Sequence, residues 1–198
     1  MLATIPAPLW QEVEAAHATP GRAYHTVDHV REVLARLAEV DAPGAPGWRQ
    51  PDEALVAALF HDAVYVPGAK DNEARSAELA RAACTRYFPR ADADRVAELV
   101  RLTARHGMLG AADVDAEQAL FLDCDMAILG AEATAFDAYD RGVAAEYAHV
   151  PRELYAAGRR AFLSALAGKE RIFLSAFFHA RLDRAARANL ARVLAATP

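Results

Sequence analysis

An apolar run in the middle of the chain, residues 54–60 (ALVAALF), ends in the dipeptide His61-Asp62. A folded protein buries such a run, so an imidazole and a carboxylate stand where the core is expected to continue. A carboxylate that leaves water needs compensating partners, and a divalent metal ion is a partner that it can share with a neutral imidazole. The His61-Asp62 pair therefore predicts a metal centre.

The composition is that of a globular protein with one hydrophobic core. The chain has 198 residues, of which 54% are apolar and 25% are charged. This length suits one domain, so we expect a single domain over residues 1–198. The formal net charge is −5, which argues against a nucleic-acid polymer or an anionic membrane surface as a partner.

The cysteines and the N-terminal segment favour a cytoplasmic protein. Cys84 and Cys124 lie far apart in apolar contexts, and we expect both to be buried, reduced thiols. The first residues form neither a basic segment nor a long apolar one, and no run reaches the roughly 20 apolar residues of a membrane span.

Apolar residues recur with helical spacing along almost the whole chain, in which Ala, Leu, Glu and Arg are abundant. This pattern predicts an all-α fold. Proline and glycine separate the helices, most densely in the loop of residues 41–48. Helices are expected over about residues 8–18, 26–40, 51–65, 72–88, 91–106, 116–129, 131–147, 152–167 and 180–195.

Two histidines near the start of the second predicted helix are candidates to join His61 and Asp62. His25 and His29 are four residues apart, so on one helix they would project from the same face. The apolar stripe of this helix passes through Val33 and Leu37, and His29 adjoins it, whereas His25 lies at the helix entry. We therefore expect His29 to be the inner ligand and His25 to lie at the rim of the site.

The sixth predicted helix offers two carboxylates, Asp123 and Asp125. At about 100° per residue their side chains point about 160° apart, so both cannot face one site. The mean direction of the neighbouring apolar residues falls close to Asp125. We therefore expect Asp125 to be a ligand and Asp123 to be a solvated acid.

The ordered set of His29, His61-Asp62 and Asp125 resembles the signature of the HD-domain superfamily of metal-dependent phosphohydrolases. More narrowly, the chain resembles the bacterial group described as predicted metal-dependent HD-superfamily phosphohydrolases. The stretches that carry this resemblance are residues 24–29 (YHTVDH), 60–65 (FHDAVY), 72–73 (NE), 76–77 (SA), 121–125 (FLDCD) and 188–190 (ANL).

The resemblance implies an HD-domain helical bundle. Its metal-site core would span about residues 24–129, with C-terminal helices over about residues 131–195 packed on it. His29, His61, Asp62 and Asp125 would together bind one divalent transition metal. A mixed imidazole and carboxylate set suits Mn, Fe, Co, Ni or Zn better than Mg.

The resemblance also implies hydrolysis of a small phosphorylated compound, such as a nucleotide, by water that the metal activates. Asp62 is expected to bind the metal and also to hold the attacking water. His106, on the predicted helix face of Leu99 and Thr103, is a candidate donor to the phosphate or the leaving group, and an ordinary hydrogen-bonded histidine is the alternative. Glu73 is a candidate for orienting the water.

The chain departs from the superfamily directly after the His-Asp pair. Many members continue with Ile-Gly-Lys, whereas Ala63-Val64-Tyr65 follows here, so a lysine that can reach phosphate is missing. Lys70, Arg75, Arg101 or Arg105 would have to replace it. A non-catalytic metal- or nucleotide-binding HD protein is therefore the alternative function.

The apolar segment of residues 171–178 (RIFLSAFF) has two interpretations. It is apolar enough to belong to the core or to form the surface of a homodimer. Periodicity does not decide between these alternatives.

Overall fold

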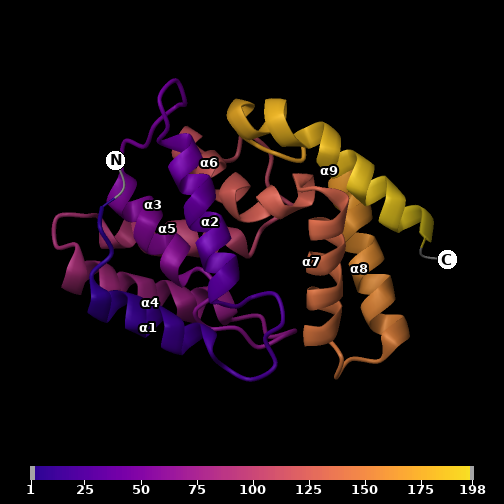
Figure 1. Cartoon of the computed structure of the whole chain (residues 1–198), viewed down its shortest axis with the longest axis horizontal. Coiled ribbons are helices and arrows are strands. Elements are labelled where there is room, and N and C mark those ends of the chain that lie inside the picture. The colour runs from indigo at the N-terminus through magenta and orange to yellow at the C-terminus, as the bar shows by residue number, and fades with distance from the viewer. Residues whose placement is uncertain (1–2, 197–198) are drawn as a thin grey trace. The chain divides into compact units, whose positions relative to one another are not determined.

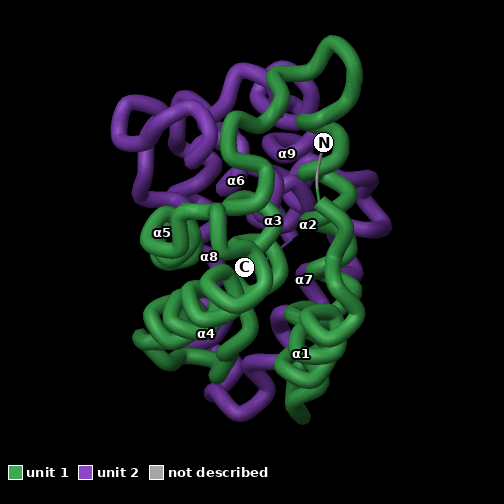
Figure 2. The backbone as a smooth tube through the Cα atoms, turned by 90° about the vertical axis from the view of Figure 1, so that its left-hand side faces the viewer, with its two compact units in different colours: residues 1–106 green, residues 107–198 purple. Residues whose placement is uncertain are grey.

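The computed structural model describes residues 3–196 and shows, within them, helices joined by loops and no β-strand (Figure 1). The predicted all-α class is therefore confirmed. None of the described helices is long and apolar enough to cross a membrane. The chain divides into two compact units, Met1–His106 and Gly107–Pro198, which are described separately below (Figure 2). The single domain expected from the length stays a prediction.

Unit 1 is built around α3 (Pro51–Phe60), which contacts α2, α4 and α5. Every residue of α3 from Glu53 to Phe60 is buried. Burial on all sides suits its sequence, because only apolar residues follow Glu53 up to the end of the helix. The other helices of unit 1 are α1 (Ala7–His17), α2 (Val27–Val40), α4 (Asn72–Tyr87) and α5 (Ala93–Thr103).

α3 ends at Phe60, before the predicted end near residue 65, because side chains of α4 hold the following segment. Ser76 Oγ accepts the N–H of Val64 at 3.0 Å and donates to its carbonyl at 3.3 Å. Asn72 pairs in the same way with Val66, at 3.0 Å and 2.9 Å. Both polar side chains are buried. These bonds replace the helical ones and lead the chain away from the axis of α3.

Unit 2 contains α6 (Ala116–Met126), the short 3-10 helix η1 (Ala127–Gly130), α7 (Ala133–Glu146), α8 (Arg152–Ala167) and α9 (Ala176–Ala196). α6 begins at a capping box, in which the side chains of Asp115 and Gln118 each accept the other's backbone N–H. η1 packs so closely on α9 that a Cβ atom on Gly130 would lie 2.6 Å from the Cβ of Leu182. Only glycine fits at that position.

The segment of residues 171–178 belongs to the core of unit 2, where Ile172, Phe173 and Phe178 are buried. Asp183 of α9 fastens it by accepting the N–H of Ile172 at 2.8 Å and Nε–H of Arg187 at 2.7 Å. Burial opposes ionisation of Asp183, but these hydrogen bonds outweigh it and lower the pKa of the carboxyl group. The core interpretation of this segment is therefore confirmed, and a homodimer stays a prediction.

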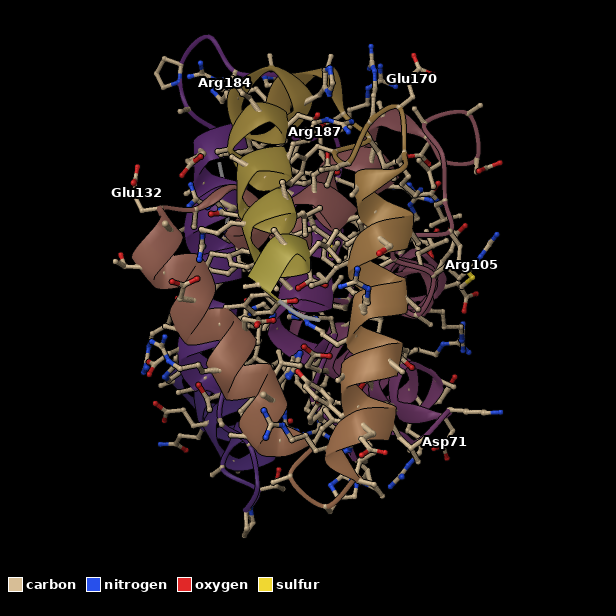
Figure 3. All side chains as sticks on the ribbon, turned by 90° about the vertical axis from the view of Figure 1, so that its right-hand side faces the viewer. Asp71, Arg105, Glu132, Glu170, Arg184 and Arg187 are labelled. Atoms are coloured by element: carbon tan, nitrogen blue, oxygen red, sulfur yellow. The ribbon has the colours of Figure 1, made fainter. Side chains whose placement is uncertain are left out.

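Arg187 also donates to the carbonyls of residues 167, 169 and 170, and Figure 3 shows it beside the loop that carries Glu170. These bonds hold the loop between α8 and α9. α9 itself begins at Ala176, earlier than the predicted start near residue 180, because Ser175 Oγ accepts the N–H of Phe178 and caps the helix.

Cys84 in α4 and Cys124 in α6 are both buried, as predicted. Burial raises the pKa of the Cys84 thiol to about 11. This thiol is therefore protonated at neutral pH and is a poor nucleophile.

His17, the last residue of α1, is a buried histidine that stays uncharged in the folded protein. Its Nδ1–H donates to the carbonyl of Val13 at 2.9 Å, and its Nε2 has no hydrogen-bond partner among residues 3–196. Burial lowers the pKa of His17 to about 4, and the nearby charge of Arg22 adds to this effect. An unfolded histidine titrates near pH 6.5.

The folded protein is expected to lose stability as the pH falls from about 6.5 toward 4, because His17 then takes up a proton only in the unfolded chain. The resulting loss in the free energy of unfolding is complete at about pH 4 and amounts to about 3 kcal/mol. His17→Gln should flatten this part of the pH profile of the free energy of unfolding, measured by urea titration. His149→Gln, at an exposed histidine, is the control. Equal slopes for wild type and His17→Gln would contradict the assignment.

Candidate metal centre

Three polar side chains of unit 1 meet where the first turn of α2 faces the end of α3. His29 on α2 is 3% exposed, and His61, directly after α3, is 1% exposed. Their Nε2 atoms lie 3.0 Å apart. Asp62 Oδ2 lies 3.1 Å from His61 Nε2 and 3.7 Å from His29 Nε2. Two nitrogen donors and one oxygen donor therefore converge on one point.

The orientation of His61 is fixed by the last turn of α3. His61 Nδ1 lies 2.9 Å from the carbonyl oxygen of Ala58. A carbonyl only accepts, so Nδ1 carries the proton and, in the neutral ring, Nε2 presents a lone pair to His29 and Asp62. A backbone carbonyl behind the ring is the usual way in which proteins orient a metal-binding histidine.

The spacing of the three donor atoms fits a transition-metal ion. For bonds of about 2.0–2.1 Å, donors around one ion lie about 2.9 Å apart at right angles and about 3.4 Å apart in a tetrahedron. The separations of 3.0, 3.1 and 3.7 Å lie close to this range. His29 and His61 are among the residues whose side chains could together hold a metal ion.

His25 lies at the rim of this cluster, ahead of the N-cap residue Thr26. Its ring stacks on Tyr65 at a centroid distance of 4.2 Å, and its Nε2 lies 4.0 Å from Asp62 Oδ2. The side chains of His25 and Asp62 are 19% and 17% exposed. Solvent therefore reaches both of these side chains in part, while His29 and His61 stay covered.

Arg22 joins the two chain segments that carry the donor atoms, a role that the sequence did not indicate. Its Nη1 donates to the carbonyl of His25 at 2.7 Å and to that of Asp62 at 2.9 Å. Its Nη2 donates to the carbonyls of Ala63 at 3.0 Å and Ala16 at 3.3 Å. An arginine in a loop is exposed by default, and no residue spacing marks this one as different.

Of the two aspartates of α6, in unit 2, Asp123 differs from expectation. Asp123 was predicted to be solvated, but it is 2% exposed, and its carboxylate accepts the N–H groups of Leu174 at 2.8 Å and Ser175 at 2.7 Å. The prediction was wrong because α6 is buried from Gln118 to Cys124, so an apolar stripe does not separate its faces. Asp125 is half-buried near the end of α6. Its role as a ligand stays a prediction.

The remaining predicted site residues lie in unit 1. α5 ends at Thr103, so His106 lies in the turn that follows and not on the predicted helix face. Glu73 is half-buried in the first turn of α4. The basic candidates Lys70, Arg75, Arg101 and Arg105 are all exposed, and Figure 3 shows Arg105 at the outer surface. The roles of these residues stay predictions.

Comparison of the chain with protein-family models, curated proteins and solved structures found no match. The chemistry of the side chains is therefore the basis of the functional proposal.

Arg22→Met is expected to lower the free energy of unfolding by about 3 kcal/mol, because part-buried carbonyls lose a charged donor. Metal affinity should fall roughly 10- to 100-fold, because the segments that carry His29 and Asp62 are no longer tied together. Urea unfolding and metal titration measure the two effects. Arg31→Met is the control, because Arg31 is 50% exposed and pairs with Asp28 at the surface. Equal stabilities of the two variants would refute the role of Arg22.

Asp123→Ala is expected to destabilise unit 2 by about 2–4 kcal/mol, because two backbone N–H groups lose their acceptor. Asp123→Asn should cost less, since an amide oxygen still accepts one bond. Thermal melting measures the difference against Asp137→Ala, which removes a half-exposed partner of Arg192. A melting temperature of Asp123→Ala equal to that of the control would show that Asp123 is not a structural residue.

Proposed function

We propose that the chain is a metal-dependent phosphohydrolase that acts on a small phosphorylated compound, such as a nucleotide. The observation that carries the proposal is the convergence of His29, His61 and Asp62 within 3.0 to 3.7 Å of one another. Buried imidazoles beside a carboxylate form the donor set of a hydrolytic metal site.

Asp125 is proposed as the fourth ligand, together with His29, His61 and Asp62. The resemblance to the HD-domain superfamily implies a carboxylate from this later helix. The hydrogen bonds of Asp123 to the backbone remove the other acid of α6 from the candidates. Two imidazoles and two carboxylates favour Mn, Fe, Co, Ni or Zn as the ion.

The proposed reaction is attack of water on phosphorus with cleavage of the ester P–O bond. A divalent ion in such a site polarises the phosphoryl oxygen and lowers the pKa of water toward about 7. Asp62 is suited to hold the water and accept its proton, because its carboxylate is partly exposed while both imidazoles beside it are covered. His106 is proposed to donate a proton to the leaving oxygen, and Glu73 to orient the water.

The proposal leaves the contact with phosphate to residues that lie at the surface. Lys70, Arg75 and Arg105 are proposed to make this contact, and all three are exposed. His25 is the further candidate for substrate contact, because its Nε2 lies 4.0 Å from Asp62 Oδ2 and its side chain is partly exposed.

A non-catalytic metal- or nucleotide-binding protein is the second candidate function. The observation that favours it is the orientation of Arg22, the arginine beside the cluster. Its guanidinium donates to backbone carbonyls of the site segments. These donors hold the protein backbone and are therefore not directed at the phosphate group of a substrate.

Purified wild-type protein is expected to carry one transition-metal ion per chain and to hydrolyse at least one substrate in a panel of small phosphate esters. His61→Ala should lose the metal, and Asp62→Ala should reduce turnover roughly 10²- to 10⁴-fold, the usual loss on removal of a general base. Elemental analysis and phosphate release measure these changes. Asp94→Ala removes an acid that is 85% exposed on α5 and is the matched control.

The outcomes separate the two functions. Turnover that neither His61→Ala nor Asp62→Ala alters would rule out this site as the catalytic one. A wild type that holds one metal per chain but releases no phosphate from any ester would favour the binding protein. A wild type without metal, even after incubation with Mn, Fe, Co, Ni or Zn salts, would contradict the hydrolase and the metal-binding form of the second function.

A further inference from the structure

Unit 2 contains a cavity of about 650 Å³ where α7 meets α8. The two helices lie side by side and are joined at one end by a short loop (Figure 1). The cavity exists because alanines occupy the helix positions that face it, at Ala144 on α7, Ala156 on α8 and Ala148 in the loop. Its size lies within the range of about 300–1,000 Å³ that is usual for small-molecule sites.

Aromatic rings form one wall of the cavity. The ring of Tyr147 lies 6.2 Å from that of His149, with 20° between their planes, and 5.6 Å from that of Tyr155. Nearly parallel rings beside a hollow offer their faces to another planar ring. Tyr155 also lines the cavity, and its hydroxyl oxygen is buried and has no hydrogen-bond partner among residues 3–196.

The charge of the lining is positive. Arg152 is its charged side chain, and among the described residues that line the cavity none carries a carboxylate. Arg152 is also the first residue of α8, where the backbone N–H groups of a helix add a partial positive charge. A ligand with a negative group is therefore favoured, and a cationic ligand is disfavoured.

We propose that this cavity binds a small planar aromatic ring that carries an anionic group. The ring stacks against Tyr147, and the anion pairs with Arg152. The site is made only of residues from unit 2 and uses none of the proposed metal ligands, so it goes beyond the proposed hydrolase function.

Isothermal titration calorimetry of the full-length protein tests the proposal with three probes. Adenosine 5′-monophosphate (AMP) carries both the ring and the anion, adenosine carries the ring alone, and inorganic phosphate carries the anion alone. AMP should bind more tightly than either of the others. AMP binding that is absent, or no tighter than adenosine binding, overturns the proposal.

Two pairs of variants locate the binding. Tyr147→Leu should weaken AMP binding about tenfold, as expected for the loss of one stacking partner, and Tyr147→Phe should preserve it. Tyr87→Leu, in α4 of unit 1, is the control. Arg152→Ala should weaken AMP binding about threefold, as for an exposed ion pair, and leave adenosine binding unchanged. Arg141→Ala, at another exposed arginine of unit 2, is its control.

Nucleotides also belong to the substrate class proposed for the metal centre, so the titration is repeated on His61→Ala. AMP binding that persists in His61→Ala and weakens in Tyr147→Leu supports the cavity. AMP binding that is lost in His61→Ala, or that is unchanged in Tyr147→Leu, overturns the proposal, whether or not the protein hydrolyses phosphate esters. If Tyr147→Leu does not melt cooperatively, Arg152→Ala decides, because Arg152 is exposed and its removal leaves the core intact.

Discussion

The guanidinium group of Arg22 makes the contacts on which the geometry of the donor cluster of unit 1 depends. Its donors reach backbone carbonyls on the approach to α2 and on the segment after α3, which are about forty residues apart in sequence. The side chains of His29 and Asp62 converge because the backbone of His25, four residues before His29, and the backbone of Asp62 are bonded to the same cation. These charge-assisted hydrogen bonds fix the positions of backbone carbonyls, and the backbone in turn fixes the positions of the donor atoms.

Helices are the part of this fold that the sequence predicts well, because apolar spacing and the breakers between helices are local signals. The predicted end of α3 is wrong because Asn72 and Ser76 form hydrogen bonds with a segment 6 to 12 residues earlier in the chain. Asp123 was misjudged for a related reason. Its partners, Leu174 and Ser175, lie 51 and 52 residues away. Helix geometry can say which way an acid points, but not what lies there.

His17 and His61 show why a buried histidine alone does not identify a metal site. Each donates Nδ1–H to a carbonyl of the preceding helical turn, that of Val13 or that of Ala58. They differ in what surrounds the other ring nitrogen. Nε2 of His17 is buried without a polar partner, and burial keeps this histidine neutral. Nε2 of His61 instead meets an imidazole and a carboxylate. The sequence signal that separates them is the adjacent Asp62, which made the His-Asp pair informative.

The hydrogen bonds of α4 to the chain after His61-Asp62 connect the metal centre to a helix that carries none of its proposed ligands. His61 takes its orientation from its own helix, but residues 64–66 acquire their course only when Ser76 and Asn72 are in place. The donor cluster therefore borders a segment whose course depends on side chains of another helix. A substitution at Ser76 or Asn72 would act on the site through this main chain, although neither side chain belongs to the proposed metal ligands.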